Sequence, residues 1–335
     1  LRLGLAGGGT DVSPYCDEYG GNVLNATIDR YAYETIEQIN ESHIHFIAED
    51  QKLEVVKDIS EPLILDGELD LHKSVYEEIM NTYNDGNKIP LKLTTFCDAP
   101  AGSGLGSSST VVVTMIRAFA ELLNLPLDDY SIASLAYKIE RVNCGQKGGR
   151  QDQYAATFGG FNFMEFNKNG HAIINTLRIK NWIICELEAS LLLYYTGVSR
   201  ESARIIADQS KNIEAKATDA VEAMHRMKQE AMVMKECLLK GDFAGFVASM
   251  EKGWASKKRS AKTVSNNNIE SIYNAAIESG ALTGKVSGAG GGGFMMFFVP
   301  PERRIAVMRT LKSFGSGVVS NCHFTSKGTQ AWRII

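Results

Sequence analysis

One loop of this chain reads Asp98-Ala-Pro-Ala-Gly-Ser-Gly-Leu-Gly-Ser-Ser-Ser-Thr110, a run of small residues between two apolar segments. Residues 91–96 before it have the composition of a β-strand, and residues 110–123 after it carry apolar side chains at helical spacing. The N–H groups of a glycine loop and of the helix N-terminus that follows converge on an anion. The segment therefore predicts a phosphate site between a strand and a helix.

Two common phosphate-binding motifs do not describe this loop. No Lys follows its glycines, as the G-x-x-x-x-G-K-[ST] motif requires, and Ser107 takes the third glycine position of a G-x-G-x-x-G motif that starts at Gly102. Three consecutive hydroxyls, those of Ser107, Ser108 and Ser109, are available to a phosphate or to Mg²⁺. Taken alone, the loop is also compatible with a flexible turn followed by a serine cap.

Two further glycine loops strengthen the phosphate interpretation. Residues 7–11 read Gly-Gly-Gly-Thr-Asp after the first predicted strand, and residues 287–293 read Ser-Gly-Ala-Gly-Gly-Gly-Gly before an apolar strand. Glycine next to a core strand is unfavourable unless the backbone approaches another group closely. We interpret the three loops as places where the backbone approaches a ligand.

The order of the predicted elements favours an α+β fold over a doubly wound sheet, because strands and helices do not alternate strictly. Strands are expected within residues 1–6, 23–39, 43–48, 53–56, 91–96, 173–195 and 285–299. Helices are expected over residues 70–83, 110–123, 131–143, 200–246, 269–279 and 304–313. The second half is richer in helix, so we place one domain at residues 1–190 and another at 191–335.

Composition excludes several classes of protein. The 335 residues are 44% hydrophobic and 22% charged, which is typical of a folded chain and not of a disordered one. The net charge is −4, and the one dense basic run is Lys257-Lys258-Arg259, so nucleic acid is not an expected partner. Six cysteines without a CxxC pair, and no apolar run of membrane-spanning length, indicate a cytoplasmic protein with no membrane partner.

The three loops together resemble the GHMP kinases, a family of small-molecule kinases that includes galactokinase, homoserine kinase and mevalonate kinase. The family's middle motif, P-x-x-x-G-L-G-S-S-[AS], is matched by Pro100 through Ser109. The resemblance implies an N-terminal lobe like ribosomal protein S5 domain 2, a ferredoxin-like C-terminal lobe and a site between them. It also implies that ATP and Mg²⁺ are cofactors, and that the residues binding ATP are Pro100, Gly102, Ser103, Gly104, Leu105, Gly106, Ser107, Ser108 and Ser109.

The same resemblance implies roles for four polar residues. Phosphoryl transfer needs a metal, donors for the phosphoryl oxygens and a carboxylate near the attacking hydroxyl. By position in the family's motifs, Ser108 and Glu140 would bind Mg²⁺, Asp152 would be the base and Arg2 would stabilise the transition state. Without the glycine loops, Glu140 is better explained as an exposed helix carboxylate and Asp152 as a helix cap. For Arg2 the alternative is a solvent-facing strand residue.

The substrate is expected to be a small sugar phosphate. Segments at residues 6–15, 148–154, 195–200 and 254–258 resemble the branch of the family that phosphorylates D-glycero-D-manno-heptose 7-phosphate at its anomeric hydroxyl, for the synthesis of nucleotide-activated heptose and surface polysaccharide. A substrate phosphate requires cations, for which Arg150, Arg200, Arg204, Lys257 and Lys258 are candidates. The residues predicted to bind substrate are Gly8, Gly9, Thr10, Asp11, Arg150, Thr196, Arg200, Lys258, Gly290 and Gly291.

Two other functions stay open at this point. Another sugar 1-kinase, of the fucose or galactose type, has the same loops, although galactokinases carry Gly-Glu-His-Thr-Asp where residues 7–11 read Gly-Gly-Gly-Thr-Asp. A non-catalytic sensor that binds ATP and sugar also fits, but the presence of all four polar residues weighs against it. The chain is expected to be a monomer or a homodimer.

Overall fold

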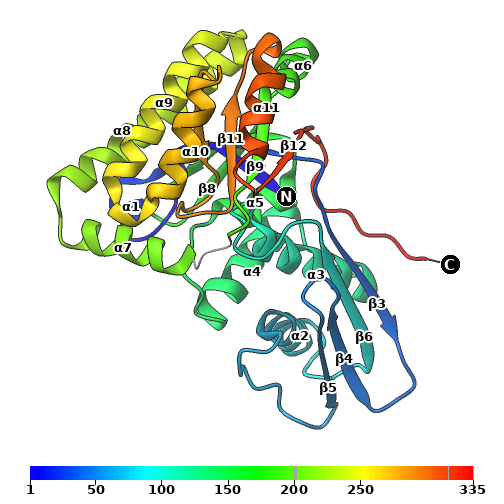
Figure 1. The fold of residues 1–335 in the computed structure, drawn as a ribbon. Coiled ribbons are helices and arrows are strands. Elements are labelled where there is room, and N and C mark those ends of the chain that lie inside the picture. The colour runs from blue at the N-terminus through cyan, green and yellow to red at the C-terminus, as the bar shows by residue number, and fades with distance from the viewer. Residues whose placement is uncertain (199–201, 316, 335) are drawn as a thin grey trace.

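Three four-stranded sheets and the helices around them make up residues 1–198, 202–315 and 317–334, which the computed structural model describes (Figure 1). The first sheet has the order β1-β2-β7-β8 and is antiparallel throughout. Its two inner strands are almost wholly buried, because helices or other strands cover both faces. The strands are β1 (Arg2–Ala6), β2 (Gly21–Thr27), β7 (Phe161–Phe166) and β8 (Ala172–Thr176).

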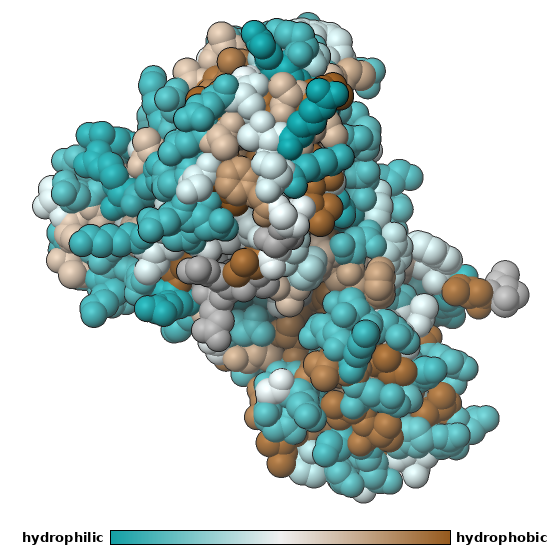
Figure 2. All heavy atoms as spheres, viewed as in Figure 1, coloured by the Kyte–Doolittle hydropathy of each residue, from teal (hydrophilic) through white to brown (hydrophobic). Residues whose placement is uncertain are grey.

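The second sheet, with the order β3-β6-β4-β5, forms a lobe of its own at the bottom of Figure 1. Buried and less buried residues alternate along its strands, since one face packs on helices α2 and α3. In Figure 2 apolar residues are scattered among hydrophilic ones on this lobe, whereas the visible face of the upper lobe is mainly hydrophilic. The elements here are β3 (Ala32–Gln38), β4 (His43–Ala48), β5 (Leu53–Asp58), β6 (Leu91–Cys97), α2 (Asp70–Tyr83), α3 (Ser107–Leu123), α4 (Asp129–Tyr137) and the π-helical turn η1 (Lys138–Asn143).

The third sheet, with the order β10-β11-β9-β12, is antiparallel and lies in the upper lobe of Figure 1. Its chain order is strand, helices, strand, strand, helix, strand, which is the ferredoxin-like arrangement. The strands are β9 (Leu191–Tyr195), β10 (Thr283–Val286), β11 (Phe294–Phe298) and β12 (Val318–Ser320). The helices are α7 (Ser202–Glu214), α8 (Thr218–Lys240), α9 (Phe243–Ser260), η2 (Lys262–Val264), α10 (Asn267–Glu278), η3 (Pro301–Arg303) and α11 (Arg304–Lys312).

One apolar core joins the first and third sheets. Leu3 and Leu24 of the first sheet belong to the same buried cluster as Leu193, Met234 and Phe294 from the second half of the chain. The boundary that we placed at residue 190 coincides with the start of β9, but apolar packing continues across it. The division into residues 1–190 and 191–335 therefore stays a prediction. None of the described helices is both long enough and apolar enough to cross a membrane.

The mixed α+β architecture is confirmed, but one predicted strand is wrong. Residues 181–190, which we expected within strands, form helix α6 (Asn181–Ser190), with Ile183 and Leu187 buried one helical turn apart. Two short helices were not predicted, α1 (Tyr15–Tyr19) and α5 (Gln151–Phe158). Both follow glycine-rich loops, and α5 has eight residues, too few for a clear helical period.

The segment after β12 runs from the third sheet back over the first. Thr325 donates its N–H to the carbonyl of Thr27 at the end of β2, and Thr329 donates to the carbonyl of Ala156 on α5. Its backbone lies directly against the turn that ends α5, because a Cβ atom on Gly328 would be 1.9 Å from the carbonyl oxygen of Thr157. The C-terminal segment therefore packs against the C-terminal end of α5, whereas Asp152 lies near the N-terminal end of this helix.

We predict that Gly328→Ala lowers the free energy of unfolding by about 1–3 kcal/mol, since the added methyl group must displace the α5 backbone. The measurement is urea denaturation followed by circular dichroism. Gly253→Ala on α9 is the matched control: the methyl group meets nothing within 4 Å, so this variant should be as stable as the parent chain or slightly more so. Equal stability of the two variants would contradict the close packing described here.

Candidate active site

A cleft of about 790 Å³ lies where the three glycine loops meet. Its lining includes Gly8 and Gly9 of the first loop, Gly102–Ser109 of the second except Ser103 and Leu105, and Gly288 of the third. Glu140 from η1 and Lys257 from α9 complete the wall. The cleft has the size of a small-molecule or cofactor site, and residues from both halves of the chain form it.

The second loop leads directly into helix α3, as the sequence predicted. Gly102, Gly104 and Gly106 all have positive φ angles, between 72° and 83°, and Gly106 is the residue before the first turn of α3. A Cβ atom at position 106 would lie 3.2 Å from Cγ of Asp152, so glycine also allows that carboxylate to approach the loop. The N–H groups of the first turn of α3 are thus available to an anion in the cleft.

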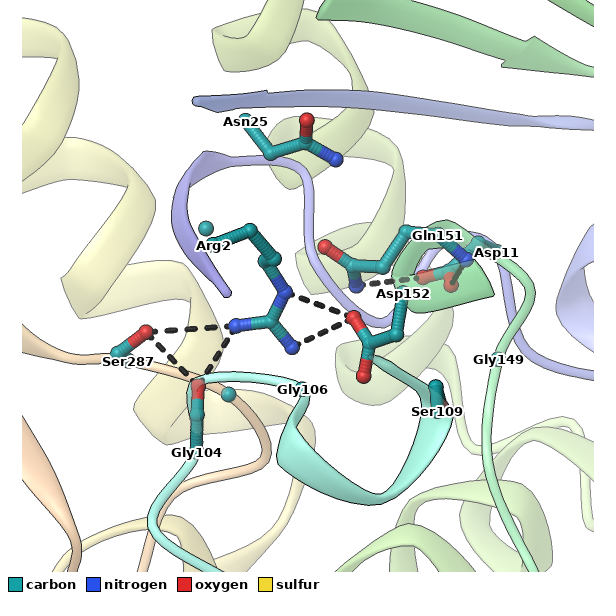
Figure 3. A network of polar contacts seen from close by, with 12 residues as sticks. Arg2, Asp11, Asn25, Gly104, Gly106, Ser109, Gly149, Gln151, Asp152 and Ser287 are labelled. Carbon is teal, nitrogen blue, oxygen red and sulfur yellow. Dashed lines mark hydrogen bonds and ion pairs between the residues drawn. The ribbon is translucent and has the colours of Figure 1, made fainter. Parts of the chain in front are cut away.

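Arg2 joins the second loop, the third loop and Asp152 (Figure 3). Its Nε and Nη2 donate to Oδ1 of Asp152 at 2.7 and 2.6 Å, and Nη1 donates to the carbonyl of Gly104 at 2.6 Å and to Oγ of Ser287 at 3.5 Å. The Arg2 side chain is buried, since only 4% of the residue is exposed. The alternative of a solvent-facing strand residue is therefore wrong for Arg2.

Asp152 lies at the second position of helix α5 and faces the cleft. Both nitrogens of Arg2 bind the same carboxylate oxygen, Oδ1, and none of the described residues hydrogen-bonds to Oδ2. The carboxylate is therefore held by one oxygen and has the other available to a ligand.

Asp11 binds the start of the same helix. Its Oδ2 accepts from the N–H groups of Arg150 and Gln151 at 2.9 and 3.0 Å, and its Oδ1 accepts from Nε2 of Gln151 at 3.2 Å and from the N–H of Gly9. A carboxylate at a helix N-terminus satisfies free N–H groups and interacts favourably with the helix dipole. Asp11 thus fixes the first loop to α5 and, through α5, positions Asp152.

Glu140 is at the centre of a second polar network. Its Oε2 accepts from Oγ of Ser109 and from Nε2 of Gln153, both at 2.6 Å, and its Oε1 pairs with Arg141 at 3.2 Å. The residue is 1% exposed, so the alternative of an exposed helix carboxylate is wrong. The π-helical turn η1, a distortion that is frequent at functional sites, carries it.

The carboxylate and hydroxyl oxygens near α3 are the type of ligand that Mg²⁺ binds. Ser108 lines the cleft with Glu140, and no described residue hydrogen-bonds to its hydroxyl, whereas the neighbouring hydroxyl of Ser109 is bound to Glu140. Among the described residues no group of three or more His, Cys, Asp and Glu is placed to hold a metal. Mg²⁺ needs few protein ligands because it keeps several waters and binds substrate phosphates, so one carboxylate and one hydroxyl suffice.

Several predicted site residues lie away from the cleft lining. Thr10 is buried and donates to the carbonyls of Gly7 and Asn22, while the Arg150 side chain extends to the carbonyl of Gly170. Lys258 pairs with Glu270 at 3.2 Å. Six others are not among the residues that line the cleft, and these are Pro100, Ser103, Leu105, Thr196, Gly290 and Gly291. Arg200 lies outside the described residues, and all these assignments stay predictions.

Some of the glycines are explained by contacts between the loops. A Cβ atom on Gly104 would lie 2.4 Å from the carbonyl oxygen of Ser287, and one on Gly288 would lie 2.7 Å from Cα of Gly104. Gly290 packs in the same way against Val264 of η2. At these positions glycine is needed because two backbone segments come close together. This is a second reason for glycine, beside the approach to a ligand that we expected.

Lys257, Arg141 and Gln151 all line the cleft. Of the three, only Lys257 was named from the sequence, as one candidate cation for the substrate phosphate. The spacing of the buried residues on α9, namely Phe246, Met250, Trp254 and Lys257, indicates which of the two adjacent lysines faces inward. That signal was missed because the predicted helix ended at residue 246. Arg141 and Gln151 follow Glu140 and Arg150 directly and have no spacing signal of their own.

Comparison with known proteins identifies the family. The family model described as "GHMP kinases N terminal domain" matches residues 70–160, and the model described as "GHMP kinases C terminal" matches residues 234–317. The D-glycero-alpha-D-manno-heptose 7-phosphate kinase of Campylobacter jejuni is 49% identical over 100% of this chain and 97% of that protein. The chain belongs to the GHMP kinases. It is therefore a kinase that transfers a phosphoryl group to an alcohol.

Solved structures agree with this membership. A D-glycero-D-manno-heptose 1-phosphate kinase from Bacteroides thetaiotaomicron is 44% identical with a TM-score of 0.85, and covers 100% of this chain and 97% of its own. The galactokinase of Lactococcus lactis in complex with galactose has a TM-score of 0.74 at 18% identity, covering 98% of this chain and 92% of its own, and shows the shared fold alone. This chain thus has the GHMP kinase fold over its whole described length.

We predict that Asp11→Asn lowers the free energy of unfolding by about 0.5–2 kcal/mol, because an amide accepts fewer of the hydrogen bonds at the start of α5. The kinase activity should fall as well, since α5 carries Asp152. Stability is measured by urea denaturation and activity by ADP release. Asp85→Asn, which alters an exposed carboxylate in the turn after α2, should change neither quantity. An Asp11→Asn variant of unchanged stability would show that Asp11 does not hold α5.

Proposed function

We propose that this kinase transfers the γ-phosphoryl group of ATP to the anomeric hydroxyl of D-glycero-D-manno-heptose 7-phosphate. The observation that carries the proposal is the carboxylate of Asp152, held at one oxygen by Arg2 and open to a ligand at the other, beside a glycine loop and a helix N-terminus. Two relatives, at 49% and 44% identity, are both named as heptose phosphate kinases. The product would supply nucleotide-activated heptose for surface polysaccharide, in the cytoplasm.

The charges of the cleft support a phosphorylated acceptor. Its lining includes the basic side chains of Arg2, Arg141, Lys147 and Lys257. ATP with Mg²⁺ needs some of this charge, and an acceptor that carries its own phosphate uses more than a neutral sugar does. The two named relatives differ in where their substrates already carry phosphate, at position 7 or at position 1. The position of transfer therefore belongs in the test.

The residues present can carry out the transfer as follows. The N–H groups of the second loop and of α3 bind the phosphates of ATP. Asp152 accepts the proton of the acceptor hydroxyl at Oδ2, while Arg2 holds Oδ1. Ser108 and Glu140 would hold Mg²⁺, which neutralises negative charge on the triphosphate.

The proposal is tested by measuring ADP release with Mg-ATP and a panel of acceptors. The panel is D-glycero-D-manno-heptose 7-phosphate, the corresponding 1-phosphate, the unphosphorylated heptose, mannose, galactose and L-fucose. We expect turnover with the 7-phosphate alone, and a loss of at least about 100-fold in kcat in Asp152→Asn. Turnover of an unphosphorylated sugar would show that the substrate is not the heptose 7-phosphate. Binding of a sugar without turnover of any acceptor would favour a non-catalytic sensor.

The metal assignment gives a separate prediction. Glu140→Gln should raise the Mg²⁺ concentration at half-maximal rate by about tenfold or more, because a neutral amide binds a hard cation more weakly than a carboxylate does. The measurement is the rate against free Mg²⁺ at constant ATP. Glu165→Gln on β7 serves as the control, since that carboxylate is not part of the cleft. An unchanged Mg²⁺ dependence in Glu140→Gln would remove Glu140 from the metal site.

A further inference from the structure

Lys257 carries a buried ammonium group at the wall of the cleft. The residue is 5% exposed and lies on the inward face of α9, in the C-terminal half of the chain. Its Nζ donates a hydrogen bond to the carbonyl of Gly288 in the third loop. A Cβ atom on Gly8 of the first loop would lie 4.0 Å from the same Nζ. The ammonium group is therefore between the first and third loops.

The Lys257 ammonium has no direct carboxylate partner among the described residues. Arg2 and Lys285 are the other buried cations near it, and Lys285 donates to two carbonyls of β1. The two carboxylates that act on Lys257 are Asp11 and Asp152, which hydrogen-bond to other donors. In residues 1–198, 202–315 and 317–334 no carboxylate lies within ion-pair distance of the Lys257 ammonium. A buried charge without a direct counter-charge is unfavourable, so an anion bound in the cleft would stabilise the charged form of Lys257.

We propose that Lys257 binds an oxygen atom of the phosphoryl group during its transfer, as a cation that the C-terminal half supplies to the reaction centre. Two observations place it there: the hydrogen bond to the third loop and the proximity to Gly8 of the first loop. This inference rests on the proposed function only in that a phosphoryl group is transferred, whichever acceptor receives it.

The step balances as an in-line displacement. The acceptor oxygen forms a bond to the γ-phosphorus, and its proton goes to Oδ2 of Asp152. The bond between the γ-phosphorus and the bridging oxygen of ATP breaks, and ADP leaves with that electron pair. Negative charge on the three peripheral phosphoryl oxygens is stabilised by the ammonium of Lys257. A cation at this place acts on the transition state and therefore on kcat.

The pH dependence distinguishes this role from a structural one. Burial, and next the charge of Arg2, lower the pKa of Lys257 to about 8, while the carboxylates of Asp11 and Asp152 act in the opposite direction. Lys285 is the remaining charged group of the cluster, and its burial lowers its own pKa. The Lys257 ammonium is charged below its pKa and neutral above it. The kcat/KM of the parent enzyme, which reports the free enzyme, should therefore fall above about pH 8.

The experiment compares Lys257→Met, Lys257→Arg and the control Lys252→Met, which changes an exposed lysine on the same helix. The acceptor is the one that the parent enzyme turns over in the panel, so failure of the heptose proposal is seen in the parent enzyme before any variant is tested. We expect Lys257→Met to lower kcat by about 100-fold to 1000-fold with the KM values of both substrates nearly unchanged. Lys257→Arg should retain activity and lose the fall above pH 8, and Lys252→Met should resemble the parent.

Three results would overturn the inference. One is a folded Lys257→Met variant whose kcat is within about threefold of the parent value. Another is a raised KM for the acceptor with unchanged kcat, which would assign Lys257 to the acceptor's own phosphate. The third is an unchanged fall above pH 8 in Lys257→Arg. If Lys257→Met does not fold by circular dichroism, the charge-retaining Lys257→Arg and its pH profile decide the question alone.

Discussion

The guanidinium group of Arg2 is the contact on which the arrangement of the site depends. It binds one oxygen of Asp152, the carbonyl of Gly104 and the hydroxyl of Ser287, which come from α5, the second loop and the third loop. Arginine suits this position because its planar group presents several donors in fixed directions and stays charged when buried. Since β1 lies in the core, the contact links the core to Asp152 and to the second and third loops.

Backbone packing between the loops places a second constraint on the site. Gly104 and Gly288 approach so closely that neither position has space for a side chain. The second and third loops come from opposite halves of the chain and meet at this contact. A site built in this way is set by the relative position of the two halves of the chain, which in turn rests on the apolar core that both halves share. Stability and geometry of the site are therefore closely connected.

Much of the fold was predictable from local pattern. Helix α2 was expected over residues 70–83, as found, because its apolar side chains recur at helical spacing and a turn sequence ends it. Residues 181–190 were predicted wrongly because a short apolar helix and a buried strand have similar composition. Helix α5 was missed because it is short and begins in a glycine-rich loop, and its start depends on Asp11, 140 residues earlier than Gln151.

The sequence by itself determined the family, the second loop with the helix that follows it, and the identity of the polar residues that the loops bring together. These follow from local spacing and from motifs that lie within a few residues of one another. Only the tertiary structure decided that the Lys257 ammonium meets the third loop at Gly288, that Ser109 and not Ser108 is bound to Glu140, and that Asp11 holds α5. The physical reason is that each of these contacts joins segments 31 to 140 residues apart in the chain, so its geometry depends on how the elements between them pack.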